Sequence, residues 1–219
     1  MECKFVHSVS LTPSNDCSLC PRLVDYRHRN KIEFPDGWNA PVPVWGSVDS
    51  EFLIVGLAPG VKGANLTGRP FTGDFAGTLL YETLIKYGFA KGQYRADPND
   101  GLTLQNCRIV NAVRCVPPAN KPTSEEEKKC RSFLKYTIEQ MTNLKVILSL
   151  GVIAHKNVLT CFDLPISKNK FKHGQRIDLS HTVTLVDSYH VSRYNTNTGV
   201  LTTPMFENVI NSIKNTINP

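Results

Sequence analysis

The chain has 219 residues, of which 25 are Lys or Arg and 19 are Asp or Glu, so its formal net charge is +6. This length suits one domain with a sizeable core. Charged residues in the first ten positions exclude a secretory signal peptide, and the longest apolar stretch, residues 146–154, is too short to cross a bilayer. We therefore expect a soluble cytoplasmic protein. The positive charge favours an anionic partner, most commonly nucleic acid.

Residues 1–50 contain scattered Pro and Gly and predict an irregular N-terminal arm. Beyond the arm, short apolar runs that predict buried strands alternate with segments of helical periodicity. The expected strands cover residues 52–55, 108–113, 146–150 and 183–187, and the main expected helices cover 78–86, 123–141 and 204–217. The alternation predicts a single α/β domain over residues 1–219, with a central, mostly parallel four-stranded sheet flanked by helices on both faces.

Four of the seven cysteines form two pairs, and we predict that they bind one metal centre. The first pair is a C-x-x-C and the second brackets a Pro-rich stretch; the four residues are Cys17, Cys20, Cys115 and Cys130. Four sulfur ligands suit either zinc or an iron–sulfur cluster, and the residues alone do not decide between them. The site would attach the arm to the rest of the fold. The other three, Cys3, Cys107 and Cys161, are expected to be spare thiols or core residues.

Unusual polar residues gather in three segments that each follow a predicted strand. These segments are residues 56–74, 114–122 and 188–199. In open parallel sheets the ligand binds at the carboxyl ends of the strands, which is the edge that all three segments leave. We therefore expect the functional site to lie there.

With its motifs taken in order, the chain resembles the uracil-DNA glycosylase superfamily, most closely the type-5 or B-type branch of thermophilic archaea and bacteria. The matching stretches are Gly56-Leu-Ala-Pro-Gly60, Gly68-Arg-Pro-Phe-Thr-Gly-Asp74, Val113-Arg-Cys-Val-Pro-Pro-Ala-Asn-Lys-Pro122 and His190-Val-Ser-Arg-Tyr-Asn-Thr-Asn-Thr-Gly199. The resemblance implies a DNA-repair enzyme that removes uracil, and also hypoxanthine or other modified bases, from DNA. It further implies a [4Fe–4S] cluster rather than zinc, a monomer, and a nucleoid-associated location.

Cleavage of an N-glycosidic bond places positive charge on the sugar and negative charge on the departing base, so it needs an anion and a hydrogen-bond donor. The first loop, residues 56–60, has no titratable group, and the resemblance points to Asp74 as the carboxylate and His190 as the donor. Asp74 could instead simply cap a helix beginning at Phe75. His190 could be an ordinary polar residue at a strand end.

The expected base pocket combines an aromatic ring, an amide and backbone N–H groups. Phe71 would stack on the extruded base, although a core position is the alternative. Asn120 would read the polar edge of uracil, with Asn111 as its rival and a simple turn as the alternative reading. The first loop would add its backbone N–H groups, from Gly56, Leu57 and Ala58.

The loop after His190 and two lysines are expected to contact DNA. Arg193 and Tyr194 resemble the wedge that fills the gap left by the extruded nucleotide, although a solvated loop is the alternative. Phosphate contacts are expected from Ser192, Thr196, Lys62 and Lys121. The motifs place no lysine as a Schiff-base former, so water is expected to be the nucleophile and no lyase step is expected.

Two other functions are compatible with parts of the sequence. One is a non-catalytic nucleic-acid-binding module built on a four-cysteine metal site, in which Asp74 and His190 would be dispensable. The other is an α/β hydrolase or transferase that acts on a free nucleotide, which would leave the basic surface unexplained. A salt-sensitive affinity for long DNA separates the DNA-binding readings from the nucleotide enzyme.

Overall fold

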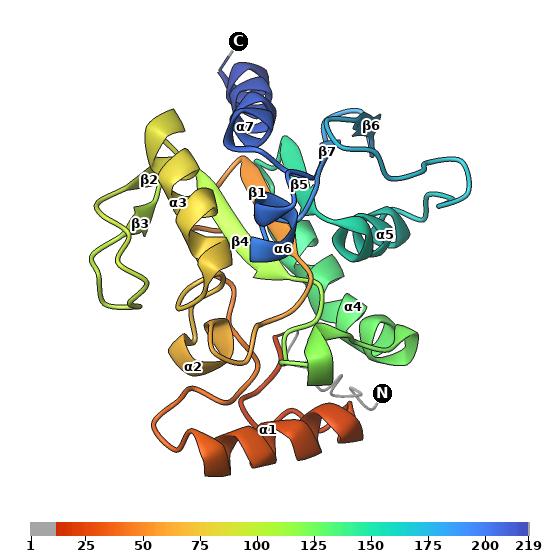
Figure 1. Ribbon diagram of the computed structural model, residues 1–219. Coiled ribbons are helices and arrows are strands. Elements are labelled where there is room, and N and C mark those ends of the chain that lie inside the picture. Colours follow the sequence, from red (N-terminus) through yellow and green to blue (C-terminus); the bar gives the residue numbers. More distant parts are fainter. Residues whose placement is uncertain (1–11, 219) are drawn as a thin grey trace, which may run out of the picture.

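A five-stranded sheet forms the centre of the computed structural model, which describes residues 12–218 (Figure 1). The strand order is β4-β1-β5-β7-β6, and only β6 is antiparallel to its neighbour. The strands are β1 Phe52–Gly56, β4 Cys107–Asn111, β5 Val146–Leu150, β6 Arg176–Asp178 and β7 Thr184–Ser188. The four predicted parallel strands are therefore confirmed, with the second one ending at Asn111 rather than at Val113.

The predicted number of strands was wrong because β6 carries no apolar run. It is a three-residue edge strand, exposed at Arg176 and Asp178 and half-buried only at Ile177. A separate two-stranded sheet, β2 Ala90–Lys91 and β3 Thr103–Leu104, lies in the segment after α3 and was also not predicted. Such short, partly exposed strands leave no periodic signal in a sequence.

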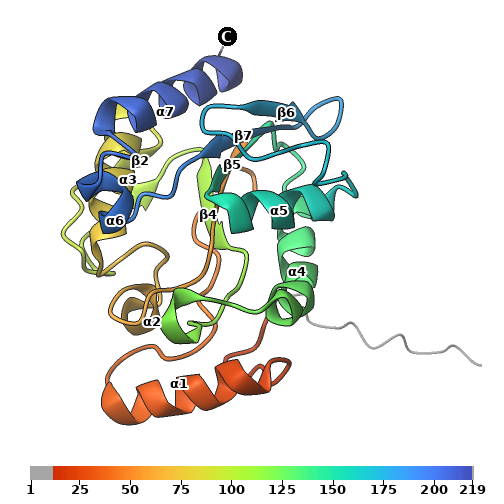
Figure 2. The ribbon, with the colours of Figure 1, turned by 45° about the vertical axis from the view of Figure 1, so that its right-hand side comes forward.

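Helices cover both faces of the main sheet, as predicted (Figure 2). Helices α3 (Phe75–Tyr87) and α7 (Thr203–Ile217) pack on one face, and α4 (Ser124–Glu139) and α5 (Val152–Cys161) on the other. Each face of the sheet has its own hydrophobic core, and strand β1 contributes side chains to both because its successive side chains point to opposite faces. Its residues 52 and 54 lie in the first core, and residues 53 and 55 in the second. Cys107 and Cys161 are buried in these cores, as expected.

The described part of the N-terminal arm is loop and turn on either side of one unexpected helix, α1 (Pro21–Glu33). The helix was not expected because it buries only Leu23, Arg27 and Asn30, two of them polar, so no apolar stripe marks it. Cys3 lies outside the described residues. None of the described helices is both long and apolar enough to span a membrane.

Side-chain caps fix where the helices begin. Thr123 and Glu126 form a reciprocal capping box at the start of α4. Asp74 accepts a hydrogen bond from the Ala76 N–H at 3.1 Å, so α3 begins at Phe75, three residues before the predicted start. Three short helices lie in the loops at the carboxyl edge of the sheet: α2 Ala64–Thr67, the 3₁₀ helix Pro118–Asn120 and α6 Arg193–Asn197.

Candidate active site

A pocket opens at the carboxyl edge of the sheet, where the three motif-bearing loops meet. It encloses about 1170 Å³ with its open solvent space included, which is large enough for a nucleoside. Eight of the predicted site residues line it: Leu57, Ala58, Lys62, Asp74, Asn120, His190, Ser192 and Arg193. The sequence therefore predicted both the edge of the sheet and most of the lining.

The other predicted residues lie around the pocket rather than on its wall. Phe71 is only 7% exposed and packs against Gly56 below the opening. Tyr194 is 74% exposed at the surface, in a position open to a large partner. Lys121 is exposed in the loop that follows Asn120, and its backbone oxygen accepts a hydrogen bond from Arg22.

Asp74 is held in a tight backbone cradle. A methyl group on Gly63 would lie 2.3 Å from its Oδ2 atom and one on Gly60 would lie 2.9 Å from it, so both glycines leave room for the carboxylate. Burial raises the pKa of Asp74 above its usual 3.8, while the N–H groups of Ala76 and Gly77 oppose the rise. Asp74 thus both caps α3 and lines the pocket, which combines the two alternatives in one residue.

His190 lines the same pocket as Asp74. Burial lowers its pKa to about 4, so its imidazole is neutral at physiological pH. The Asn195 side chain donates to the His190 carbonyl at 2.8 Å and fixes the turn after β7. A neutral imidazole carries one N–H donor, as the predicted hydrogen bond to a departing base requires.

Phe71, Asn111 and Gly56 meet at the inner end of the site. A methyl group on Gly56 would lie 2.5 Å from the Phe71 ring and 2.4 Å from Asn111 Oδ1, so both side chains contact this glycine. The Phe71 ring centroid lies 6.1 Å from that of His190. Asn111 is 4% exposed, and its side chain hydrogen-bonds to no other described residue. Asn120, in contrast, is exposed near the pocket mouth.

The loop that carries Phe71 and Asp74 is fixed by a buried ion pair. Arg69 donates to both carboxylate oxygens of Asp100 at 2.8 Å, and its guanidinium lies 4.9 Å from the centroid of Trp45. The backbone N–H groups of Arg95 and Leu102 also donate to Asp100. The Arg69 hydrogen bonds hold the pKa of Asp100 well below its usual range. No local sequence pattern marks this pair, because its members lie 31 residues apart.

A second buried network supports the strand that leads to His190. Asp187 Oδ1 accepts the Ser149 hydroxyl at 2.6 Å and lies 2.9 Å from Nδ1 of His155. Nε2 of His155 lies 2.8 Å from the Asn169 carbonyl, which can only accept. Both ring nitrogens therefore face acceptors, and His155 is best satisfied as an imidazolium. Burial alone would lower the pKa of His155, but the hydrogen bond and charge of Asp187 raise it.

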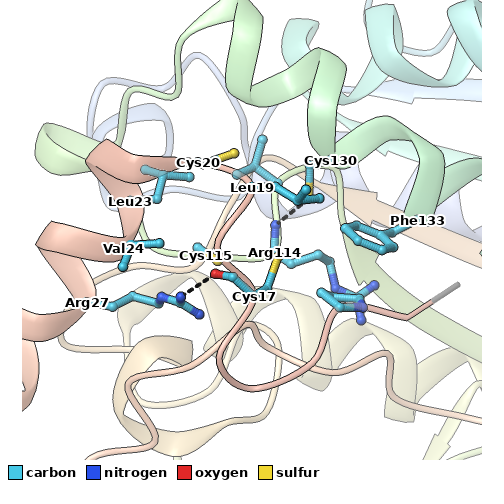
Figure 3. Close-up of a pocket in the computed structure, with 12 residues that line it drawn as sticks. Cys17, Leu19, Cys20, Leu23, Val24, Arg27, Arg114, Cys115, Cys130 and Phe133 are labelled. Carbon is cyan, nitrogen blue, oxygen red and sulfur yellow. Dashed lines mark hydrogen bonds between the residues drawn. The ribbon is translucent and has the colours of Figure 1, made fainter. Parts of the chain in front are cut away.

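The four predicted metal ligands line one pocket, which lies between helix α1, helix α4 and the segment that follows β4 (Figure 3). The remainder of the lining is mostly apolar, including Leu19, Leu23 and Phe133. The Arg114 N–H donates to the Cys130 sulfur at 3.3 Å. Burial raises the pKa of Cys115 to about 12 and that of Cys130 to about 11, so these thiols are neutral without a cation.

Both predicted cysteine pairs contribute to this pocket, and together they offer four sulfur donors. Four sulfurs are a donor set that suits a soft metal or an iron–sulfur cluster. Within residues 12–218, however, no three Cys, His, Asp or Glu side chains are arranged so that they could hold a metal ion. Polar contacts hold the arm in place nearby. Arg22 makes two hydrogen bonds to Glu126 at 2.7 and 2.8 Å, and Arg27 donates to the Cys17 carbonyl at 2.6 Å.

A sheet covered on both faces, with a carboxylate, a neutral imidazole and a buried aromatic ring at its carboxyl edge, defines an α/β protein with an enzyme-like pocket. A family model described as Uracil DNA glycosylase superfamily matches residues 43–214. The chain therefore belongs to the uracil DNA glycosylase superfamily, as its motifs predicted.

Several relatives that align with about 90% of this chain are type-5 uracil-DNA glycosylases. The chain is 40% identical to the type-5 uracil-DNA glycosylase of Thermus thermophilus over 90% of this chain and 92% of that protein. It is 38% identical to the type-5 enzyme of Mycobacterium leprae over 90% of each chain. Similarity to the type-4 uracil-DNA glycosylase of Archaeoglobus fulgidus is lower, 33% over 68% of this chain and 69% of that protein. The predicted likeness to the type-5 branch is confirmed.

Removal of Asp100 should destabilise the fold strongly. Asp100→Ala leaves Arg69 buried without its partner, so we expect a loss of about 3–5 kcal/mol in the free energy of unfolding, measured by urea denaturation. Asp36→Ala, which removes an exposed carboxylate, is the control and should change the free energy by less than about 0.5 kcal/mol. Equal effects of the two variants would show that the Asp100 pair does not support the loop.

The His155–Asp187 pair should make stability depend on pH. A raised pKa means that the contribution of the pair is complete below the unfolded pKa of about 6.5. The contribution is then lost as the pH rises through the folded pKa. We expect the urea midpoint of the wild type to fall across this range and that of His155→Gln to change less. His28→Gln alters an exposed histidine and should retain the wild-type slope. A wild-type midpoint independent of pH would contradict the imidazolium.

Proposed function

We propose that this protein is a monofunctional uracil-DNA glycosylase, which hydrolyses the N-glycosidic bond of uracil in DNA and leaves an abasic site. The observation that carries the proposal is the pocket lined by Asp74 and His190, with the buried Phe71 ring centroid 6.1 Å from that of His190, in a chain of this superfamily. The names of the type-5 relatives support uracil as the substrate. DNA repair follows from that activity.

Asp74 and His190 supply the two charges that the reaction needs. As the bond to the base breaks, the Asp74 carboxylate stabilises the positive charge on the sugar and orients the attacking water. The neutral His190 imidazole donates a hydrogen bond to uracil O2 as negative charge grows there. Phe71 stacks on the extruded base, and the N–H groups of residues 56–58 add hydrogen bonds beside it.

The geometry favours Asn111 over Asn120 as the residue that reads the base edge. Asn111 is buried beside the Phe71 ring, and its amide has free donors and acceptors to match the O4 and N3 atoms of uracil. Asn120 is exposed at the pocket mouth, where it suits the backbone of the same nucleotide. Because the first loop has no titratable side chain, we also propose that hypoxanthine and other modified bases are accepted.

The DNA strand approaches over Lys62, Ser192 and Arg193, which line the pocket. Tyr194, exposed and beside Arg193, is the better placed of the two predicted wedge residues. The Ser192 hydroxyl oxygen accepts from the Asn195 N–H at 3.4 Å as a helix cap, which leaves its proton available for a phosphate. Lys121, exposed beyond Asn120, is an additional phosphate contact. The Thr196 hydroxyl instead hydrogen-bonds to the Ser192 and Arg193 carbonyls, and Thr196 lines the groove that contains Glu82 and Glu207.

Cys17, Cys20, Cys115 and Cys130 are proposed to hold a [4Fe–4S] cluster, with zinc as the alternative. Their shared pocket, its apolar wall and the N–H donor at Cys130 support this proposal. When bound, the cluster supplies a cross-link between the arm and the loop after β4. The proposed bond cleavage takes place elsewhere, in the pocket lined by Asp74 and His190.

The glycosylase test compares wild type with Asp74→Asn on a labelled duplex holding one U·G pair, followed by alkali cleavage. We expect the variant to lose at least about a hundredfold in single-turnover rate, because it removes the charge that stabilises the sugar cation. Asp36→Asn is the matched control. Cleavage of equal rate by Asp74→Asn would move the catalytic charge elsewhere, and absence of cleavage by intact wild type would favour a non-catalytic DNA-binding module.

The pH profile of the same reaction should show a fall in acid and no step at the ordinary histidine pKa of about 6.5. The wild-type rate should fall as the pH drops through the Asp74 pKa, which lies above 3.8, because protonation removes the carboxylate charge. No step is expected near pH 6.5, since His190 has a pKa of about 4. A rate that follows a group near pH 6.5, and does so only with His190 present, would contradict a neutral imidazole.

The cluster test replaces one predicted ligand and one buried control thiol. Cys115→Ser should lose bound iron and visible absorption, and should unfold more easily, because metal binding contributes to folding. Cys161→Ser should keep the bound iron and the visible absorption. Metal analysis of wild type distinguishes iron with sulfide from zinc, and wild type free of both metals would contradict the proposal.

A further inference from the structure

Phe75 exposes an aromatic ring at the pocket rim that the proposed chemistry does not use. It is the first residue of α3 and directly follows Asp74. Its side chain is 38% exposed and lines the pocket, whereas the Phe71 ring deeper in the site is only 7% exposed. A single exposed apolar side chain is ordinary on a protein surface, so it is the place of Phe75 on the pocket wall and its contact with Arg193 that point to a ligand.

Arg193 lies over this ring from the opposite loop. Its guanidinium carbon is 5.2 Å from the Phe75 ring centroid, a cation–π distance. Among the described residues no carboxylate forms an ion pair with Arg193. The contact between these two planar groups thus joins the segment after Asp74 to the segment after His190. The guanidinium has no carboxylate partner among the described residues, and the ring keeps exposed surface.

The surroundings favour a base over a phosphate as the partner of the ring. Phe75 also lines a groove on its other side, together with Glu82 and Glu207. Glu207 is paired with Lys86, at 2.7 Å, but Glu82 forms no ion pair among the described residues. Negative charge in this groove repels a phosphate, whereas an apolar ring stacks with any nucleobase.

We propose that Phe75 and Arg193 form a stacking platform for the nucleobase next to the extruded nucleotide on the same strand. This inference rests on the proposed glycosylase function. Phe71 takes the extruded base inside the pocket, and Phe75, four residues later, takes its unstacked neighbour at the rim. Arg193 adds charge for the adjoining phosphate and holds the ring in place. The platform offsets part of the stacking lost when the duplex is opened.

The experiment measures binding, so that it does not depend on catalysis. A duplex carries a tetrahydrofuran abasic analogue with 2-aminopurine on one flank or the other, and its affinity and fluorescence are followed with each variant. Phe75→Leu keeps apolar volume but removes the ring, and Phe75→Tyr keeps the ring. Ile166→Ala is the control, because Ile166 is 39% exposed and lies outside the pocket.

We expect Phe75→Leu to weaken binding by about 5- to 100-fold, the range for loss of one base–aromatic stack. Phe75→Leu should also abolish the change in 2-aminopurine fluorescence that binding causes on one flank. Phe75→Tyr and Ile166→Ala should resemble wild type in both affinity and fluorescence. The slope of log affinity against log salt should be unchanged in Phe75→Leu and should fall by about 0.9 in Arg193→Gln.

Three results would overturn the platform. They are wild-type affinity in Phe75→Leu, an unchanged fluorescence signal on both flanks, and a salt slope that falls in Phe75→Leu as in Arg193→Gln. The last would show that Phe75 only positions the arginine. Failure of wild type to prefer the abasic duplex over an undamaged one would overturn the proposed function itself, and the platform with it.

Discussion

The buried pair of Arg69 and Asp100 is the constraint on which the site depends. Phe71 adopts a φ of 51°, a left-handed conformation that is costly for a bulky residue, by about 1–3 kcal/mol. The backbone keeps this conformation because the loop around it is held on several sides. Asp100 accepts from Arg69 and from two backbone N–H groups, and the Tyr94 hydroxyl donates to the Phe71 carbonyl at 3.2 Å. The ion pair thereby specifies one loop geometry, and that geometry places both the Phe71 ring and the Asp74 carboxylate.

Burial shifts the pKa values of Asp74 and His190, the two proposed catalytic groups, in opposite directions. It raises the pKa of Asp74 and lowers that of His190, and in both cases it disfavours the charged form. The N–H groups of Ala76 and Gly77 oppose the rise at Asp74 and favour its carboxylate form, whereas the His190 imidazole stays neutral. The pocket thus places a carboxyl group and a neutral donor in one environment of low polarity, which strengthens the interaction of each with charge that develops on a substrate.

The sequence predicted the parts of this molecule that depend on local patterns. The four apolar strands, the helix expected over residues 123–141 and the loops at the carboxyl edge all follow from periodicity and turn chemistry. Helix α1 was missed because it buries Arg27 and Asn30, and Asp100 because its partner is distant in sequence. The proposed preference for Asn111 over Asn120 also depends on burial, since Asn111 ends β4, Asn120 lies in the loop after it, and only the folded chain places Asn111 beside Phe71.

The position of the cysteine pocket separates stability from chemistry. Among the described residues, the buried members of the core that α1 shares with the rest of the fold are Leu23, Val113, Cys115 and Cys130, so apolar contact alone holds the arm weakly. A cross-link at the four thiols would close long chain segments, whose ordering is otherwise costly. Cys115 begins the loop that leads to Asn120, whereas Asp74 and His190 belong to loops fixed by the Arg69 and His155 networks. Loss of the cross-link should therefore loosen the pocket mouth first and leave the two reactive groups in place.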